Sequence, residues 1–256
     1  ETLNALVDAG YVGRSEEGYR FLRETERELE NEIKGIEVGP GDIRRSSKRF
    51  LNDILDETSR VNYQGKTFQV NLSIDGEEIT SKGYIDLKTY SPIYQRYEDL
   101  DPDGLKTQSF SEDGTLYWIA DNEKQHDIYE KLKSIYQINT VVKEKRGNEL
   151  SQEEQEALGQ KQEDLQRLRN EVEREFKRSF QRGTLIYNGD TEEFDTTSTS
   201  LTSLVARKTD NAIPKVFTSF KHGSATVKDR HIEQIFGDLA SASNPSVFSE
   251  LGVVQD

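Results

Sequence analysis

Cysteine and methionine are absent from this chain of 256 residues, and histidine occurs only three times. Without cysteine the chain can form no disulfide and no zinc site built on thiolates. Two of the histidines, His222 and His231, have the acidic neighbours Asp229 and Glu233, but structural metal sites use tighter and more regular spacings. We therefore expect this chain to bind no metal and no other cofactor.

Long apolar runs are missing as well. No stretch approaches the roughly 20 apolar residues that cross a bilayer, and residues 1–20 lack the basic start and apolar centre of a secretion signal. These absences predict a soluble, cytoplasmic protein without membrane contact. The chain is 32% apolar and 32% charged, which favours small cores joined by exposed helices. Its net charge of −14 argues against a surface devoted to nucleic acid, although it allows a local basic patch.

The motifs of common catalytic folds are absent too. The sequence has no Gly-x4-Gly-Lys-Ser/Thr phosphate loop, no Gly-x-Gly-x-x-Gly after a strand and no Gly-x-Ser-x-Gly around a serine. We therefore expect no catalytic residue and no independent enzyme here.

The first 38 residues have the pattern of the end of a winged helix followed by a linker helix. A short apolar helix stops at Gly10, and residues 11–22 predict the hairpin that forms the wing. Charges of alternating sign over 23–34 predict a solvated helix. Glycine and proline at 35–41 then mark a boundary.

Two groups of basic residues are candidates for contact with nucleic acid. The wing offers Arg14 and Arg20, although many winged helices serve only in packing. A helix predicted over about 43–57, with Asp42 as its cap, carries a ridge of four cations at i, i+1, i+4 and i+5. These are Arg44, Arg45, Lys48 and Arg49. The ridge is either a solvated face paired with nearby acids, which is the usual meaning of such a pattern, or an anion contact.

The segment that follows the ridge predicts β-structure. Strict alternation of apolar and polar residues over 68–74 indicates a half-buried strand, and Asp75-Gly76 is a strong hairpin turn. Further strands are expected over 84–90 and 115–120, with a polar loop and turn over 95–113 between them.

A pair of helices is predicted next, over 122–182. Asn122 with Gln125, and Ser151 with Glu154, have the spacing of capping boxes. The second helix has a narrow apolar stripe and balanced charges elsewhere, which is closer to a coiled-coil arm than to a core helix. Such a helix pairs either within one chain or between two chains.

The last part of the chain returns to mixed structure. A strand at 184–187 leads into a turn at 188–190, and a helix begins at Leu201 and is expected to stop before Ile213-Pro214. Residues 223–256 predict a polar loop and one short helix. The uncapped first helix and the abrupt ending favour a piece of a larger intracellular protein.

Several segments resemble the P-loop protein of the BREX phage-resistance system, the BrxC/PglY family. The resemblance is carried by residues 2–12, 18–22, 26–33, 52–55, 180–189, 217–220 and 247–252. It implies a large protein whose ATPase, with its ATP and Mg²⁺ site, lies upstream of this chain. It also implies an antiviral role in which this region assembles with other BREX components.

We therefore expect an α+β fold with four parts. These are the winged-helix remnant and linker (1–38), a small antiparallel sheet domain (42–121), a helical arm (122–182) and an α+β segment that completes the sheet (183–256). The expected function is non-catalytic assembly that couples the ATPase to partner proteins or DNA. The alternative is a DNA-binding module that uses the wing and the ridge.

Overall fold

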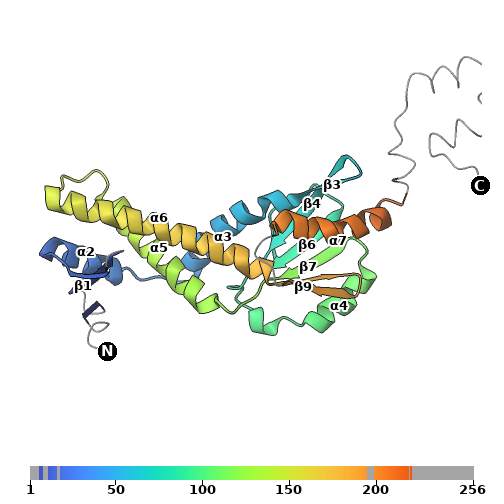
Figure 1. Cartoon of the computed structure of the whole chain (residues 1–256), viewed down its shortest axis with the longest axis horizontal. Helices are drawn as coiled ribbons and strands as arrows, with labels where there is room; N and C mark the ends of the chain where they lie inside the picture. The colour runs from blue at the N-terminus through green and yellow to red at the C-terminus, as the bar shows by residue number, and fades with distance from the viewer. Residues whose placement is uncertain (1–5, 8–10, 16–17, 195–198, 219, 221–256) are drawn as a thin grey trace, which may run out of the picture.

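The computed structural model describes residues 6–7, 11–15, 18–194, 199–218 and 220. Figure 1 shows an elongated molecule, with a sheet at one end and two long helices that project from it. The N-terminal elements lie against the far ends of these helices. The predicted winged-helix start is described only at residues 6–7, which are helical, so the winged helix stays a prediction.

The N-terminal hairpin and linker helix form where the sequence predicts them, but the linker helix is not fully solvated, because Leu29 and Ile33 are buried in the core. Strand β1 (Val12–Ser15) pairs antiparallel with β2 (Gly18–Phe21), and α2 (Glu24–Gly35) follows. The Arg27 guanidinium lies 4.2 Å from the centre of the Tyr11 ring, which ties the start of the hairpin to α2.

Helix α3 (Pro40–Leu55) begins earlier than its sequence predicts. Asp42 is not the N-cap. It occupies the third helical position, and its carboxylate accepts a 3.0 Å hydrogen bond from the backbone N–H of Gly39, which is the N-cap. Pro40 at the first position explains the shift, because proline needs no N–H partner there and its fixed φ suits a helix.

A mixed sheet follows, in the order β3-β4-β6-β7-β8-β9, with β5 paired to β4 outside this path. Its strands are β3 (Arg60–Tyr63), β4 (Lys66–Ile74), β5 (Glu77–Glu78), β6 (Ile85–Tyr90), β7 (Thr115–Ile119), β8 (Thr184–Tyr187) and β9 (Asp190–Glu193). The predicted alternation in β4 and the turns at 75–76 and 188–189 are confirmed. Because β8 pairs with β7, the sheet joins segments on both sides of the helical arm.

The prediction of an antiparallel sheet is wrong at its centre, where β4, β6 and β7 run parallel. Parallel neighbours usually need a connection of about a dozen residues or more. Here residues 75–84 alone connect β4 to its parallel neighbour β6. Asn71 makes two hydrogen bonds to the backbone of Gly83, at 2.6 and 3.1 Å. A Cβ at Gly83 would lie 2.2 Å from the carbonyl oxygen of Gln69, so only glycine allows this tight return.

The predicted polar loop over 95–113 is also wrong, because it contains helix α4 (Pro102–Ser111). The sequence predicts a turn within this loop, but Asp101 is the N-cap of α4 and Pro102 is its first residue, a position that favours proline. Leu105 of α4 packs on one sheet face, against Tyr117 and Ile119 of β7. Leu116 and Trp118 point to the other face of β7 and belong to the main core. Both faces of β7 are therefore covered, and all its residues are buried.

The predicted helical arm is a hairpin of α5 (Gln125–Lys145) and α6 (Gln152–Gln181), which pack against each other within one chain. The capping box of Ser151 and Glu154 is confirmed. The one expected at Asn122 and Gln125 is wrong, since the N-cap of α5 is Lys124 and no side chain caps it. A coiled-coil character of the arm stays a prediction.

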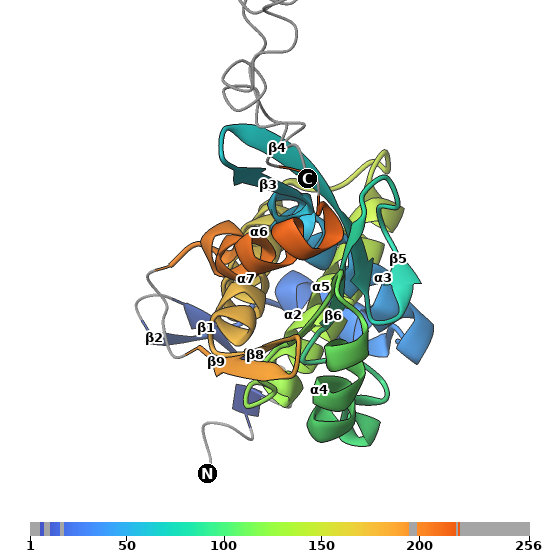
Figure 2. The same ribbon diagram turned by 90° about the vertical axis from the view of Figure 1, so that its right-hand side faces the viewer.

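Helix α7 (Leu201–Val216) covers the other face of the sheet (Figure 2) and extends past Pro214, further than predicted. Pro214 has no N–H to donate to the carbonyl of Asp210 four residues earlier, so one helical hydrogen bond is lost, and α7 ends two residues later. The predicted tail at 223–256 lies outside the described residues. None of the helices in the described part of the chain combines the length and apolar composition needed to cross a bilayer.

Candidate functional site

The four cations of the predicted ridge are all exposed on α3, but they divide into two pairs with different surroundings. Arg44 and Lys48 both contact Glu77 of β5, with an Arg44–Glu77 separation of 3.6 Å. The hydrogen bond from Lys48, together with the positive charge of Arg44, lowers the pKa of the Glu77 carboxyl. This half of the ridge is a solvated face with its own counter-charge.

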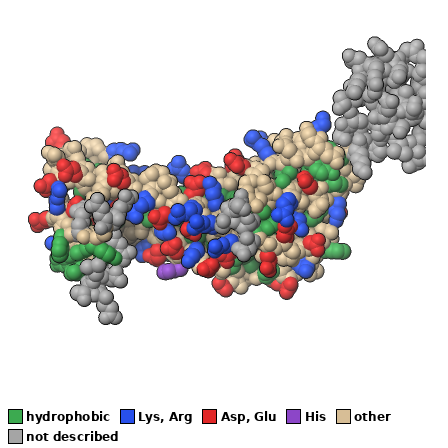
Figure 3. All heavy atoms as spheres, in the orientation of Figure 1, with side chains coloured by type: hydrophobic (Ala, Val, Ile, Leu, Met, Phe, Trp, Pro, Cys, Tyr) green, Lys and Arg blue, Asp and Glu red, His purple; other side chains and the backbone are tan. Residues whose placement is uncertain are grey.

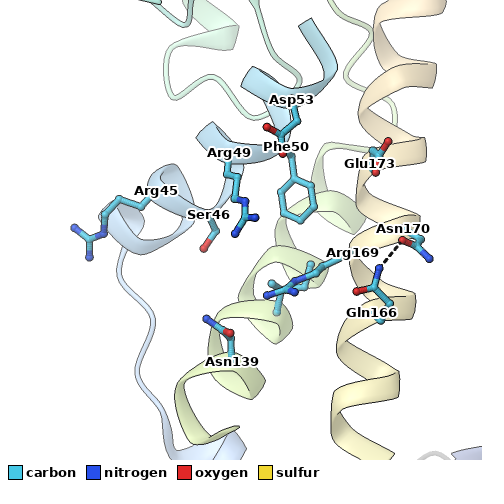
Figure 4. Close-up of a pocket in the computed structure, with 11 residues that line it drawn as sticks. Arg45, Ser46, Arg49, Phe50, Asp53, Asn139, Gln166, Arg169, Asn170 and Glu173 are labelled. Atoms are coloured by element: carbon cyan, nitrogen blue, oxygen red, sulfur yellow. Dashed lines mark hydrogen bonds between the residues drawn. The ribbon is translucent and has the colours of Figure 1, made fainter. Parts of the chain in front are cut away.

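The other half of the ridge faces a cleft. Arg45 pairs with Asp42 at 2.5 Å. The pKa of the Asp42 carboxyl is lowered, first by the backbone hydrogen bond from Gly39 and then by Tyr136 and Arg45. Figure 4 shows the Arg45 side chain turned outward at the rim, whereas Arg49 points into the cleft. Within the described residues, Arg49 takes part in no ion pair. Arg49 is therefore the ridge residue best placed to meet a ligand.

The cleft lies among α3, α5 and α6 and has a volume of about 330 Å³. It is lined by Arg45, Ser46, Arg49, Phe50, Asp53, Ile135, Asn139, Gln166, Arg169, Asn170 and Glu173. Phe50 forms part of its floor, with its ring centre 6.5 Å from that of buried Phe176. Figure 4 shows Arg169 of α6 reaching across toward α3, near Asn139 of α5.

Charge is unevenly divided within the cleft. Figure 4 places Asp53 and Glu173 at one end, and Ser46, Asn139 and the guanidinium groups of Arg49 and Arg169 at the other. Glu173 is already paired with Lys177 at 2.6 Å. Among the described residues, Arg169, like Arg49, takes part in no ion pair. The basic end of the cleft therefore presents cations, an amide and a hydroxyl without an internal counter-charge.

A second group of charged residues clamps α2 to the far end of the arm. Lys161 of α6 pairs with Glu30 of α2, and both side chains are largely shielded, being 18% and 22% exposed. Lys145 of α5 lies 2.7 Å from Glu32 of α2. Gln137 of α5 donates a 2.9 Å hydrogen bond to the carbonyl oxygen of Ile36, just after α2. These contacts hold both arm helices against the N-terminal segment.

Sequence reasoning found Arg45 and Arg49 but missed Arg169, Asn139 and the Lys161 clamp. Arg169 is one of many charges on α6, and no local pattern sets it apart. The side chains of the wing residues Arg14 and Arg20 lie outside what the structure describes. In Figure 1 the wing stands beside the far part of the arm, away from the sheet. No group of three or more potential metal ligands occurs among the described residues.

One family model matches the chain over residues 37–208. It is described as the fourth domain of the BREX ATP-binding protein BrxC, with a six-stranded beta sheet. The matched range contains α3, the arm and all six strands of the path from β3 to β9, which agrees with that description. Among curated proteins and among solved structures, none matches this chain.

Proposed function

This chain belongs to the BrxC family of BREX ATP-binding proteins, whose fourth domain it contains, and we propose that it is a non-catalytic assembly region of the BREX system. In this proposal it couples an upstream ATPase to other BREX components or to DNA, and it acts in the cytoplasm. In this proposal the catalytic site for ATP and Mg²⁺ lies in the upstream ATPase and not in this chain. Its chemistry is that of contact surfaces.

The observation that carries the proposal is one continuous apolar core. It runs from Leu29 and Ile33 of α2, through the arm, to the sheet and to α7. A contiguous core of this kind transmits displacement, because packed interiors are dense and deform little. A movement of α2 therefore moves the arm and the sheet with it. This property suits a spacer between a motor domain and its partners.

The Lys161–Glu30 pair is more shielded than the Lys145–Glu32 pair, so we choose it as the point at which to interrupt this coupling. Reversing one charge places two like charges in contact in a partly shielded site, and removing one partner of a well-buried pair is strongly destabilising. The effect here is smaller, because about a fifth of each side chain still reaches solvent. We expect the clamp to loosen while the sheet stays folded.

The test uses the full-length protein in cells that carry a BREX system. Lys161→Glu and Glu30→Lys are each expected to reduce protection against phage, whereas the double charge swap restores it in part, because Asp164 also lies 3.3 Å from the Lys161 side chain and would repel a carboxylate there. Lys177→Glu is the matched control, since Lys177 lies on the same helix, is 47% exposed and pairs with the equally exposed Glu173. ATP hydrolysis by the purified protein is expected to persist in every variant. Full phage protection by both single variants would contradict the proposal.

Contact with nucleic acid is the second candidate function, and the cleft beside α3 favours it. A salt titration of DNA binding by the chain tests it, because backbone contacts give a steep dependence on salt. Binding that falls steeply with salt and is lost in the fourfold alanine variant of Arg44, Arg45, Lys48 and Arg49 supports it. No binding at low salt would overturn it. Light scattering on the same sample tests self-association through α6.

A further inference from the structure

We propose that the basic end of the cleft among α3, α5 and α6 is a binding site for a phosphate group, held between Arg49 and Arg169. The inference is independent of the assembly role and deepens the nucleic-acid alternative by naming its ligand chemistry and residues. It differs from the ridge hypothesis, because it leaves out Arg44 and Lys48 and adds a residue from another helix.

The first step is the position of the two guanidinium groups. They come from α3 and α6, separate helices that pack together, and both turn toward the same end of the cleft in Figure 4. Bringing like charges together is unfavourable unless a counter-charge lies between them. The described lining places its two carboxylates, Asp53 and Glu173, at the opposite end. An anion at the basic end supplies the missing charge.

The second step is the chemistry of the surrounding groups. Asn139 and Ser46 stand beside the two guanidiniums and offer an amide N–H and a hydroxyl as further donors. Arginine presents several N–H groups in one plane, which suits the tetrahedral oxygens of a phosphate better than a point charge does. A cation is disfavoured at this end. The donor set therefore selects an oxyanion.

The third step is the size and shape of the site. A volume of about 330 Å³ exceeds what one phosphate needs, so the group belongs either to a free nucleotide or to a phosphodiester backbone. The aromatic ring of Phe50, half-buried on the floor, offers an apolar surface beside the charge. A nucleotide and a phosphodiester backbone present the same phosphate chemistry, and the experiment below distinguishes between these two ligands.

The experiment measures binding of inorganic pyrophosphate, ATP, and labelled single-stranded and duplex oligonucleotides to the full chain at low salt. Arg49→Ala and Arg169→Ala are each expected to weaken binding on the order of tenfold, since each removes a charge-assisted contact. Arg44→Ala and Lys48→Ala are the matched controls on the same helix. They are expected to change binding by less than about twofold, because both side chains contact Glu77 and neither lines the cleft.

A variant that is expected to strengthen binding shows that the losses in the arginine variants do not come from unfolding. Asp53→Asn removes a negative charge from the cleft and is expected to strengthen binding severalfold, which a damaged fold would not do. Tighter binding of oligonucleotides than of ATP assigns a backbone phosphate, and the reverse assigns a nucleotide. Equal losses in the Arg49 and Arg44 variants, or no binding of any probe, would overturn the site. Neither result bears on the assembly role, which is measured by phage protection.

Discussion

Phe180 anchors the arm to the sheet, and its replacement by alanine is expected to cost the chain much of its stability. The ring is fully buried and stands edge-on to Trp118, with ring centres 5.0 Å apart. The indole N–H of Trp118 donates a 3.2 Å hydrogen bond to the backbone oxygen of Phe180, which alanine retains. The loss is therefore one of packing, about 3–5 kcal/mol for a buried phenylalanine.

Urea unfolding followed by Trp118 fluorescence measures this loss, since the chain has a single tryptophan. The matched control is Phe110→Ala, whose ring is 71% exposed and whose loss is expected to stay within about 0.5 kcal/mol. If the arm and the sheet unfold together, the Phe180 variant shows one transition at a lower urea concentration. A loss below about 1 kcal/mol, or one equal to that of the control, would refute the anchoring of the arm by this contact.

Three further changes test other parts of the fold. Gly83→Ala is expected to lower the free energy of unfolding by at least about 2 kcal/mol, because the new Cβ meets the backbone of Gln69; an unchanged urea midpoint would contradict the tight parallel return. Ser151→Ala removes the side-chain cap of α6 and is expected to cost about 1 kcal/mol by the same measurement, so a neutral result would show that this cap does not stabilise the arm. Burial raises the pKa of the Asp75 carboxyl, so its contribution to stability is full below its unfolded pKa near 4 and declines as pH rises through the folded value. Asp75→Asn cannot ionise and is expected to lose less stability than the natural chain as the pH rises above about 4; parallel pH profiles of the urea midpoint would contradict this cause.

Local patterns predicted the elements whose physics is local. The alternation in β4 and the reciprocal hydrogen bonds of Ser151 and Glu154 depend on neighbours within a few residues, and both are confirmed. The Asn188-Gly189 turn is of the same kind, with both residues at positive φ.

Some local predictions failed, namely the caps at Asp42 and Asn122 and the loop over 95–113. The other errors came from contacts between distant residues. The direction of β6 depends on how Gly83 packs against β4, and alternation is the same in parallel and antiparallel strands. The division of the ridge depends on Glu77, which lies in a different element from α3. Arg169 joins Arg49 only because α6 folds back beside α3. No spacing of residues in the sequence predicts these contacts.

The rigid link between α2 and the sheet is the central claim, and a distance measured between these two ends tests it most directly. Glu28 in α2 and Glu193 in β9 are both exposed, and the absence of natural cysteine lets spin labels attach only at Glu28→Cys and Glu193→Cys. Double electron–electron resonance is expected to give one narrow distance distribution, which Lys161→Glu broadens. A broad or multiple distribution in the otherwise unchanged chain would contradict the claim.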